Sequence, residues 1–385
     1  MGLQEHYVKL LTSMDNSVSM FGLQFLMKDK LWHFSARQVV GYVILSFYPF
    51  FIIYTVAMFS DDFVHIMYCL TTFAVFVSLG SRLYSFKFRW MKARELSDEF
   101  SVAFERMSKS PHIRRNFEEY LVFCEKFLQA VKWVLFGCGY SLLYSSIFIF
   151  LWTGEKLLPY EFYIPFFDHT TITGYLEIYA YQAIISKLSL DILVCSVQHF
   201  YCHIFLGIGH LKVLEQHFGD LNEVIVEESL QQDRQAIREI LKKIVIEHQS
   251  HRKIMRSFND FCSIQTLIGI ICDMFTLIIS IFLTMSTNWI QGIGIILGTC
   301  SDILASNFMG SLFVIGCESF EKIIYNCKWY CLSADLQTDL YIILHAAQHP
   351  VRPSIGGFMA LELQTFLTCM KNVYTITMFL YNFVV

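Results

Sequence analysis

The sequence predicts an all-α, polytopic membrane protein with seven transmembrane helices, its N-terminus in the cytosol and its C-terminus outside the cell. Three observations predict this fold class: the composition, seven apolar stretches of membrane-spanning length, and a one-sided distribution of Lys and Arg. Of the 385 residues, 55% are hydrophobic and 16% are charged, whereas a typical soluble chain carries about 25% charged residues. The chain also holds 37 Phe, 20 Tyr and 6 Trp. This balance excludes a disordered chain, a nucleic-acid-binding surface and an ordinary cytosolic enzyme.

The expected spans follow from length, because a membrane-spanning helix needs about 20 mostly apolar residues. The first contains no charged residue, and a tight turn at Ser60, Asp61 and Asp62 separates it from the second. The seven expected spans are residues 39–59, 63–80, 133–152, 175–207, 264–285, 293–316 and 357–383.

A few charged residues lie inside these spans. Each costs about 2.5–3.5 kcal/mol at mid-membrane, so it should face protein or water. Lys187 and Asp191 are four residues apart on one helix and are expected to pair. Pairing across helices is the main expectation for the others, and lining of a watery path is the alternative. These others are Asp273, Asp302, Glu362 and Lys371.

The orientation follows from the basic residues. The segment before the first span and the connections 81–132, 210–263 and 318–355 hold four, eleven, eight and three Lys and Arg, together 26 of the 29. The alternate connections hold one, Lys156. Because basic loops stay in the cytosol, this asymmetry predicts a cytosolic N-terminus, the reverse of a G-protein-coupled receptor. All twelve cysteines fall in spans or cytosolic segments, so no disulfide framework is expected.

The cytosolic connections contain helical patterns of their own. Apolar residues recur at helical spacing over residues 227–261, so the fifth span is expected to extend several turns into the cytosol. Residues 93–130 are similar but are interrupted by Pro111, and 333–348 predict a separate amphipathic helix. Such helices offer packing surfaces in water, where the hydrophobic effect operates, and oligomerisation through them is expected.

No sequence feature indicates catalysis. The chain has no glycine-rich phosphate loop, no Ser-His-Asp arrangement and no His-Glu-x-x-His motif. The pairs His199/His203 and His345/His349 have helical spacing, but neither shows an obvious third ligand. We therefore expect structural histidines, no metal and no cofactor.

Aromatic residues in the outer half of the predicted bundle favour a closed cavity for a small apolar or aromatic molecule. A ligand that buries roughly 250 Å² of apolar area gains about 6 kcal/mol before the cost of association, which corresponds to micromolar affinity at best. The candidate ligand-binding residues lie on the second, third and fourth spans. They are His65, Tyr68, Cys69, Thr72, Phe73, Tyr140, Tyr144, Ser145, Phe148, Tyr179, Tyr181 and Ile184.

The C-terminal third resembles the insect odorant receptor family. The resemblance is carried by an ordered series of motifs, strongest over residues 320–380: Cys327-Lys-Trp329-Tyr330, then Arg352-Pro353-Ser-Ile-Gly356-Gly357-Phe, then Leu361-Glu-Leu-Gln-Thr-Phe366-Leu and Lys371-Asn-Val-Tyr374. Over the whole chain it extends to length and inverted topology. The resemblance implies a ligand-gated, non-selective cation channel that forms a tetramer in the plasma membrane of an olfactory sensory neuron, at its dendrite.

In this family an odorant-binding subunit joins the co-receptor Orco, and cytosolic helices form the anchor between subunits. The resemblance therefore implies that Trp329, Tyr330 and Leu340 lie at a subunit interface. The connection 210–263 is short, which resembles an odorant-specific tuning subunit, since the co-receptor has a much longer one.

The related gustatory receptors end in Thr-Tyr, five apolar residues and Gln-Phe, whereas this chain has Thr375-Ile376 and Asn382-Phe383 at the matching places. This difference argues against a gustatory receptor and makes Phe379, Asn382 and Phe383 candidates for the pore gate. A homomeric gustatory-type channel stays the alternative. A secondary transporter is a third, disfavoured because neither repeats nor broken mid-membrane helices are evident.

The expected organisation has six parts. They are a cytosolic N-terminal segment (1–38), spans 1–4 with the ligand pocket (39–209), a cytosolic helical connection (210–263), spans 5 and 6 (264–317), a cytosolic anchor region (318–355) and a pore-lining last helix (356–385).

Overall fold

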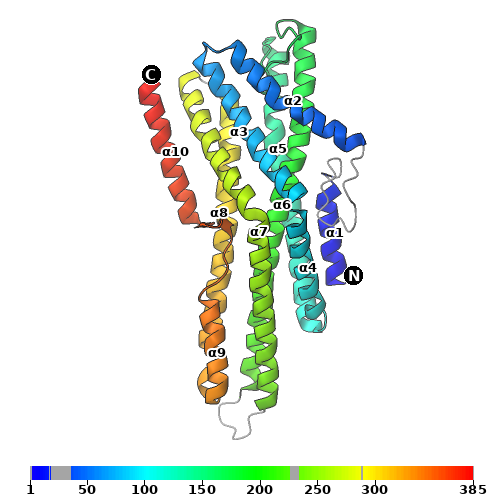
Figure 1. Ribbon diagram of the computed structural model, residues 1–385, viewed down its shortest axis with the longest axis vertical. Coiled ribbons are helices and arrows are strands. Elements are labelled where there is room, and N and C mark those ends of the chain that lie inside the picture. The colour runs from blue at the N-terminus through cyan, green and yellow to red at the C-terminus, as the bar shows by residue number, and fades with distance from the viewer. Residues whose placement is uncertain (1, 17, 19–35, 226–233, 288, 385) are drawn as a thin grey trace.

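Four long helices of 37 to 54 residues in the described part of the chain give the molecule its elongated shape (Figure 1). These are α5 (Pro111–Thr153), α6 (Ile172–Val224), α7 (Arg234–Thr287) and α8 (Ile290–Asn326). At 1.5 Å per residue, the 54-residue α7 is about 80 Å long, against about 30 Å for the hydrocarbon core of a bilayer. The prediction that the helix of the fifth span extends back over the preceding connection is confirmed from Arg234 onward.

The computed structural model describes residues 2–16, 18, 36–225, 234–287 and 289–384. The predicted features within 19–35 and 226–233 lie outside these residues. Shorter elements complete the fold: α1 (Leu3–Asp15), α2 (Ala36–Met58), α3 (Phe63–Phe88), α4 (Trp90–Met107), a 3₁₀ turn (Trp329–Cys331), α9 (Ala334–Ala347), β1 (Ser354–Ile355), β2 (Met359–Ala360) and α10 (Leu363–Val384). The two short strands pair antiparallel.

Local sequence signals set several helix ends. The Asp62 side chain accepts hydrogen bonds from the N–H groups of Val64 and His65 and so caps the start of α3. Pro111 begins α5, as its fixed φ favours. Gly154 ends the same helix with a φ of 76°, a left-handed conformation that glycine adopts without strain.

Among the described residues, six helices are long and apolar enough to cross a membrane: α2, α3, α5, α6, α7 and α8. The seventh predicted span corresponds to α10, a 22-residue helix that stands beside the upper parts of α7 and α8 (Figure 1). Its Met370 and Val373 pack against residues of both helices. The separate helix predicted over 333–348 is confirmed as α9.

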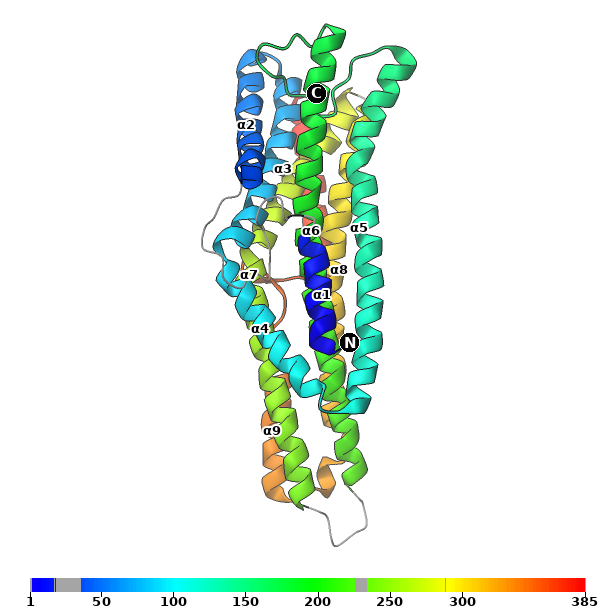
Figure 2. The same ribbon diagram turned by 90° about the vertical axis from the view of Figure 1, so that its right-hand side faces the viewer.

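Helix α6 runs through the middle of the bundle (Figure 2). Every residue from 194 to 207 is buried, as expected for a helix that is surrounded on all sides. The main hydrophobic core joins α6 to α1, α4, α5, α7, α8 and α9. The predicted boundaries after residues 209, 263 and 317 lie inside the continuous helices α6, α7 and α8.

Three features differ from the sequence analysis. Helix α3 continues to Phe88, so Arg82, which was counted among the cytosolic charges, lies inside the bundle 3.4 Å from Asp302. The N-terminal segment contains α1, an amphipathic helix whose Leu3, Tyr7 and Leu11 are buried. Lys187 contacts Asp191, as predicted. Glu362 differs from its prediction, because it precedes α10 and contacts Arg352 of the same connection and not a residue of another helix.

Candidate ligand site

The loop of residues 154–171, between α5 and α6, folds into the upper end of the bundle. The Gln182 side chain of α6 donates to the carbonyl oxygens of Tyr160 (2.7 Å) and Phe162 (3.1 Å), and accepts from the Tyr160 N–H (3.1 Å). From α2, the Thr55 hydroxyl oxygen accepts from the Tyr163 N–H at 2.8 Å. The loop is therefore fixed to two helices and covers the space between them.

Phe162 is the deepest part of this loop and is fully buried. Its ring lies 5.4 Å from Tyr48 of α2 and 6.4 Å from Tyr181 of α6. Cys69 of α3 and Ile185 of α6 belong to the same buried cluster. An aromatic side chain thus fills the region where the sequence placed a ligand.

A second group of rings lies beside it, around His65. The His65 ring is 4.3 Å from Phe59 and stacks on Tyr163 at 5.6 Å. Its Nε2 is buried and has no hydrogen-bond partner among the described residues. Tyr68, one turn further along α3, packs edge-on against Trp289 at 4.8 Å. The group therefore combines apolar faces with one buried imidazole.

The structure divides the predicted ligand-binding residues into two sets. His65, Tyr68, Cys69, Thr72 and Tyr181 lie within or beside the two ring groups. The rest lie outside these two ring groups. Three of these residues are half-buried: Tyr140, Ser145 and Tyr179, whose hydroxyl donates to the Leu143 carbonyl. The other four are exposed, Tyr144 at 67%: Phe73, Tyr144, Phe148 and Ile184.

The loop residues were missed by the sequence analysis. Tyr160, Phe162 and Tyr163 contribute three rings to the site, against the two of His65 and Tyr68 from the second span. The signal was present, because residues 160–167 read Tyr-Glu-Phe-Tyr-Ile-Pro-Phe-Phe. Such a density of aromatic residues is unusual for a solvated connection.

Glu161 lies in the same loop, above Cys69. The Cys69 thiol donates to the Glu161 carbonyl oxygen at 3.6 Å. Burial raises the pKa of the Glu161 carboxyl from its ordinary value of 4.5 to about 7. The docked loop therefore favours the protonated form of this residue.

We expect loop docking to weaken as the pH rises from about 4.5 to about 7, because ionised Glu161 is stable only when the loop is undocked. Above about pH 7 the docking of the loop should weaken no further, because Glu161 is then ionised in both states. The rate at which a thiol reagent labels Cys69 is followed by mass spectrometry in the wild type and in Glu161→Gln. The ratio of the wild-type rate to the variant rate should rise several-fold across this pH range. An unchanged ratio would show that the carboxyl does not control the loop.

Hydrophobic contacts connect the ring group around His65 to α10. Phe282 and Leu283 of α7 form a cluster with Tyr68 of α3, Trp289 and Leu380 of α10. Further down, Val373 of α10 belongs to a cluster with α7 and α8. A displacement of Tyr68 would therefore change the packing of Leu380 of α10 through one layer of side chains.

The predicted gate residues lie on the side of α10 that faces away from the bundle. Phe379, Asn382 and Phe383 are all exposed, and the rings of Phe379 and Phe383 stack at 6.1 Å. Residues Thr377 and Leu380 occupy the packed side. In a single chain this leaves an apolar strip along α10.

The predicted subunit-interface residues also separate. Trp329 and Tyr330 are exposed, Tyr330 at 61%. Leu340 is only 5% exposed, because it packs into the core of its own chain with Leu336 and Ile343. Its position gives no support to the interface prediction, whereas the neighbouring Tyr341 and Ile342 point outward.

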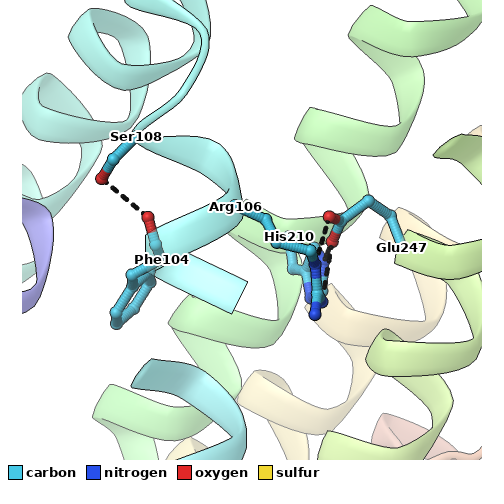
Figure 3. A network of polar contacts seen from close by, with 5 residues as sticks. All are labelled: Phe104, Arg106, Ser108, His210 and Glu247. Atoms are coloured by element: carbon cyan, nitrogen blue, oxygen red, sulfur yellow. Dashed lines mark hydrogen bonds and ion pairs between the residues drawn. The ribbon is translucent and has the colours of Figure 1, made fainter. Parts of the chain in front are cut away.

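A buried polar network joins three helices at the end of α4 (Figure 3). Arg106 of α4 holds the Glu247 carboxylate of α7 through two hydrogen bonds of 2.6 and 3.3 Å. His210 of α6 contacts the same carboxylate at 2.9 Å. The close-up also shows the Ser108 hydroxyl donating to the Phe104 carbonyl, which closes the last turn of α4. This network holds α4, α6 and α7 together.

One group of described residues has metal-ligand chemistry. Asp15, Cys195 and His199 are buried with their ligand atoms within 4.8 Å of one another. The sequence analysis found no further ligand beside the His199/His203 pair, whereas the structure places Asp15 and Cys195 next to His199. The His199 Nε2 lies 2.9 Å from the Asp15 carboxylate. That hydrogen bond ties α1 to α6 and accounts for the contact.

The largest described groove is elsewhere. It has a volume of about 630 Å³ and opens between α2 and α3, lined by Tyr42, Leu83 and Tyr84. Its walls face outward from the bundle, so it offers less enclosure than the region under the loop. For a small apolar ligand, burial is the main source of affinity, and the ring groups are the better candidate.

Comparisons with known proteins agree with this architecture. The family model described as 7tm Odorant receptor matches residues 62–374. Two similar solved structures are of the insect olfactory receptor OR5 from Machilis hrabei. The structure without a named ligand has a TM-score of 0.77 and 16% identity and covers 98% of each chain. The complex with eugenol has a TM-score of 0.75 and 15% identity, covering 98% of this chain and 99% of that chain.

Proposed function

Since the chain belongs to the 7tm odorant receptor family, we propose that it is the odorant-binding subunit of a heteromeric, ligand-gated, non-selective cation channel. Its ligand is a small, semi-volatile, apolar or aromatic molecule. The observation that carries this proposal is the aromatic site under loop 154–171, with its connection through Trp289 and Phe282 to Leu380.

The ligand site consists of His65, Tyr68, Cys69, Thr72 and Tyr181, with Phe162 as its cover. The rings supply apolar contact area, and the His65 imidazole supplies a polar group. The similar structure determined with eugenol supports a small organic ligand for this fold. We do not assign the exposed Tyr144, Phe148 and Ile184 to the wall of the site.

Gating follows from the cluster that joins α3, α7 and α10. A ligand beside His65 and Tyr68 favours a different packing of Tyr68 on Trp289 and Phe282, and Leu380 moves with that layer. The ligand changes the populations of two arrangements of the bundle. The size of this change is set by the difference between the ligand's affinities for the two arrangements. The apolar strip with Phe379 and Phe383 lines the conducting path beside the equivalent helices of other subunits.

The partner is the co-receptor Orco, in a tetramer with the N-terminus in the cytosol and the C-terminus outside, in the plasma membrane of a sensory dendrite. Outward-facing large side chains in and beside α9 support a contact between subunits. They are the aromatic Trp329, Tyr330 and Tyr341, and Ile342. Aromatic residues are enriched at such interfaces.

The test is electrical. We expect cells that express this chain together with Orco to give a cation current in response to at least one compound of a broad volatile panel. Cells with this chain alone should give none. A response without the co-receptor would favour the homomeric gustatory-type channel, and silence despite surface expression would contradict the proposal.

A further inference from the structure

A tight turn of residues 164–167 forms part of the loop that covers the ligand site. The Phe167 N–H donates to the Ile164 carbonyl at 3.3 Å, with Pro165 and Phe166 between them. Phe166 has a φ of 73°, and in the described part of the chain it is the only non-glycine residue with a positive φ. Proline followed by a residue of positive φ is typical of a type II turn, whose second central position favours glycine. Phenylalanine at this position is therefore strained.

The Phe166 side chain makes no burying contact with the described part of its own chain. It is 104% exposed, and the neighbouring Phe167 is 41% exposed. A large apolar side chain in water forgoes the free energy that burial would give. A residue that is strained in its backbone and fully exposed at its ring does not stabilise this fold, so we infer that its contact lies outside the chain.

The contacts of the neighbouring residues place the turn at the level where two spans end. The Tyr163 N–H donates to the Thr55 hydroxyl at 2.8 Å, and Thr55 lies in the last turn of α2. Ile164 packs with Tyr175 and Ile178, which lie in the first two turns of α6. The turn is therefore level with the ends of α2 and α6.

Exposed aromatic side chains stand at the same end of other spans. The ends of α2, α5 and α6 lie together at one end of the molecule (Figure 2). Trp152, one residue before the end of α5, is 80% exposed, and Phe63, the first residue of α3, is also exposed. Aromatic residues gather at the boundary between hydrocarbon and water in membrane proteins. Phe166 extends this aromatic boundary onto the loop.

We propose that the turn 164–167 inserts Phe166 into the headgroup region of the phospholipid leaflet at this end of the bundle, which is the outer leaflet in the orientation proposed above. Aromatic side chains anchor peripheral segments to membranes in this way. The exposed area favours lipid over a protein partner. Two phenylalanine rings bury at most about 500 Å², whereas each partner of a stable protein interface buries about 800 Å².

The anchor acts on the ligand site through Tyr163. The Tyr163 ring stacks on His65 at 5.6 Å and contacts the His169 ring at 4.5 Å, so the base of the turn belongs to the ring group around His65. A turn that is held in lipid keeps the loop docked. Cys69, whose thiol donates to the Glu161 carbonyl of the same loop, then stays covered. The lipid surface thus contributes to closing the site.

The first experiment identifies what the Phe166 side chain touches. The full-length chain carries p-benzoylphenylalanine, a photoreactive analogue of phenylalanine, in place of Phe166 and is illuminated in phosphatidylcholine vesicles. Mass spectrometry should detect lipid adducts several-fold more often than with the analogue in place of Asp61, an exposed residue of the turn between α2 and α3. Adducts to protein, or no excess of lipid adducts over the Asp61 position, would overturn the proposal.

Phe166→Gly provides a second test that keeps the fold, because glycine adopts this φ without strain. In the same vesicles, a thiol reagent should label Cys69 several-fold faster in this variant than in the wild type. The matched control is Phe166→Trp, which keeps an interfacial ring and should label at the wild-type rate. If the side chain has no lipid contact, relief of strain is the main effect of the glycine, and Cys69 labelling will be slower or unchanged. That result would contradict the anchor.

Discussion

Replacing Gly310 with alanine is expected to destabilise the receptor by about 3 kcal/mol, at the upper end of overpacking effects. A Cβ atom at this position of α8 would lie 2.0 Å from the Leu361 carbonyl oxygen and 2.6 Å from the Leu361 Cβ. Leu361 cannot turn aside, because it is buried and its N–H donates to the Pro353 carbonyl. Helix α8 and residues 353–361 must therefore separate, and those residues lead into α10.

The measurement is the fraction of monodisperse protein that survives heating, read by size-exclusion chromatography. Gly298→Ala is the matched control, since it lies on the same helix and a Cβ there meets nothing within 4 Å. That variant should be unchanged or slightly more stable, because alanine favours a helix by about 1 kcal/mol over glycine. Equal stability of the two variants would contradict the close approach of Leu361.

Replacing Glu247 with alanine is expected to cost a similar amount, about 3 kcal/mol, because it leaves Arg106 and the buried His210 without their shared partner. The carboxylate links α4, α6 and α7 (Figure 3), so its loss loosens all three. Heating followed by the same chromatography should show a melting temperature several degrees lower.

The control for this change is Glu239→Ala, an exposed glutamate two turns earlier on α7. Exposed substitutions of this kind alter stability by less than about 0.5 kcal/mol. If both variants melt at the same temperature, the network does not stabilise the helix contacts.

The sequence was sufficient for the helices and for some of their pairings. Unbroken apolar periodicity predicted that α7 continues beyond the membrane, Pro111 predicted the break between α4 and α5, and four-residue spacing predicted the pair of Lys187 and Asp191. These features depend on residues that are close in the chain, for which local geometry decides the outcome.

The site was less predictable, for a physical reason. Lipid is as apolar as a protein core, so hydropathy does not tell which face of a span points inward. Tyr140, Tyr144 and Phe148 share a face of α5, yet Tyr144 and Phe148 are exposed. Phe162 was missed because it lies in a loop that tertiary hydrogen bonds from Gln182 and Thr55 hold in the bundle.

We propose that the odorant binds in the aromatic site under loop 154–171 and acts on α10 through Tyr68. The most direct test is the concentration dependence of the odorant-evoked current in cells that also express Orco, compared between Tyr68→Ala and Tyr144→Ala at equal surface expression. Our account predicts that Tyr68→Ala raises the half-maximal concentration about tenfold, corresponding to about 1.4 kcal/mol, while Tyr144→Ala leaves it within about twofold of the wild type. A shift for Tyr144→Ala with none for Tyr68→Ala would place the ligand on the outer face of α5 and contradict the account.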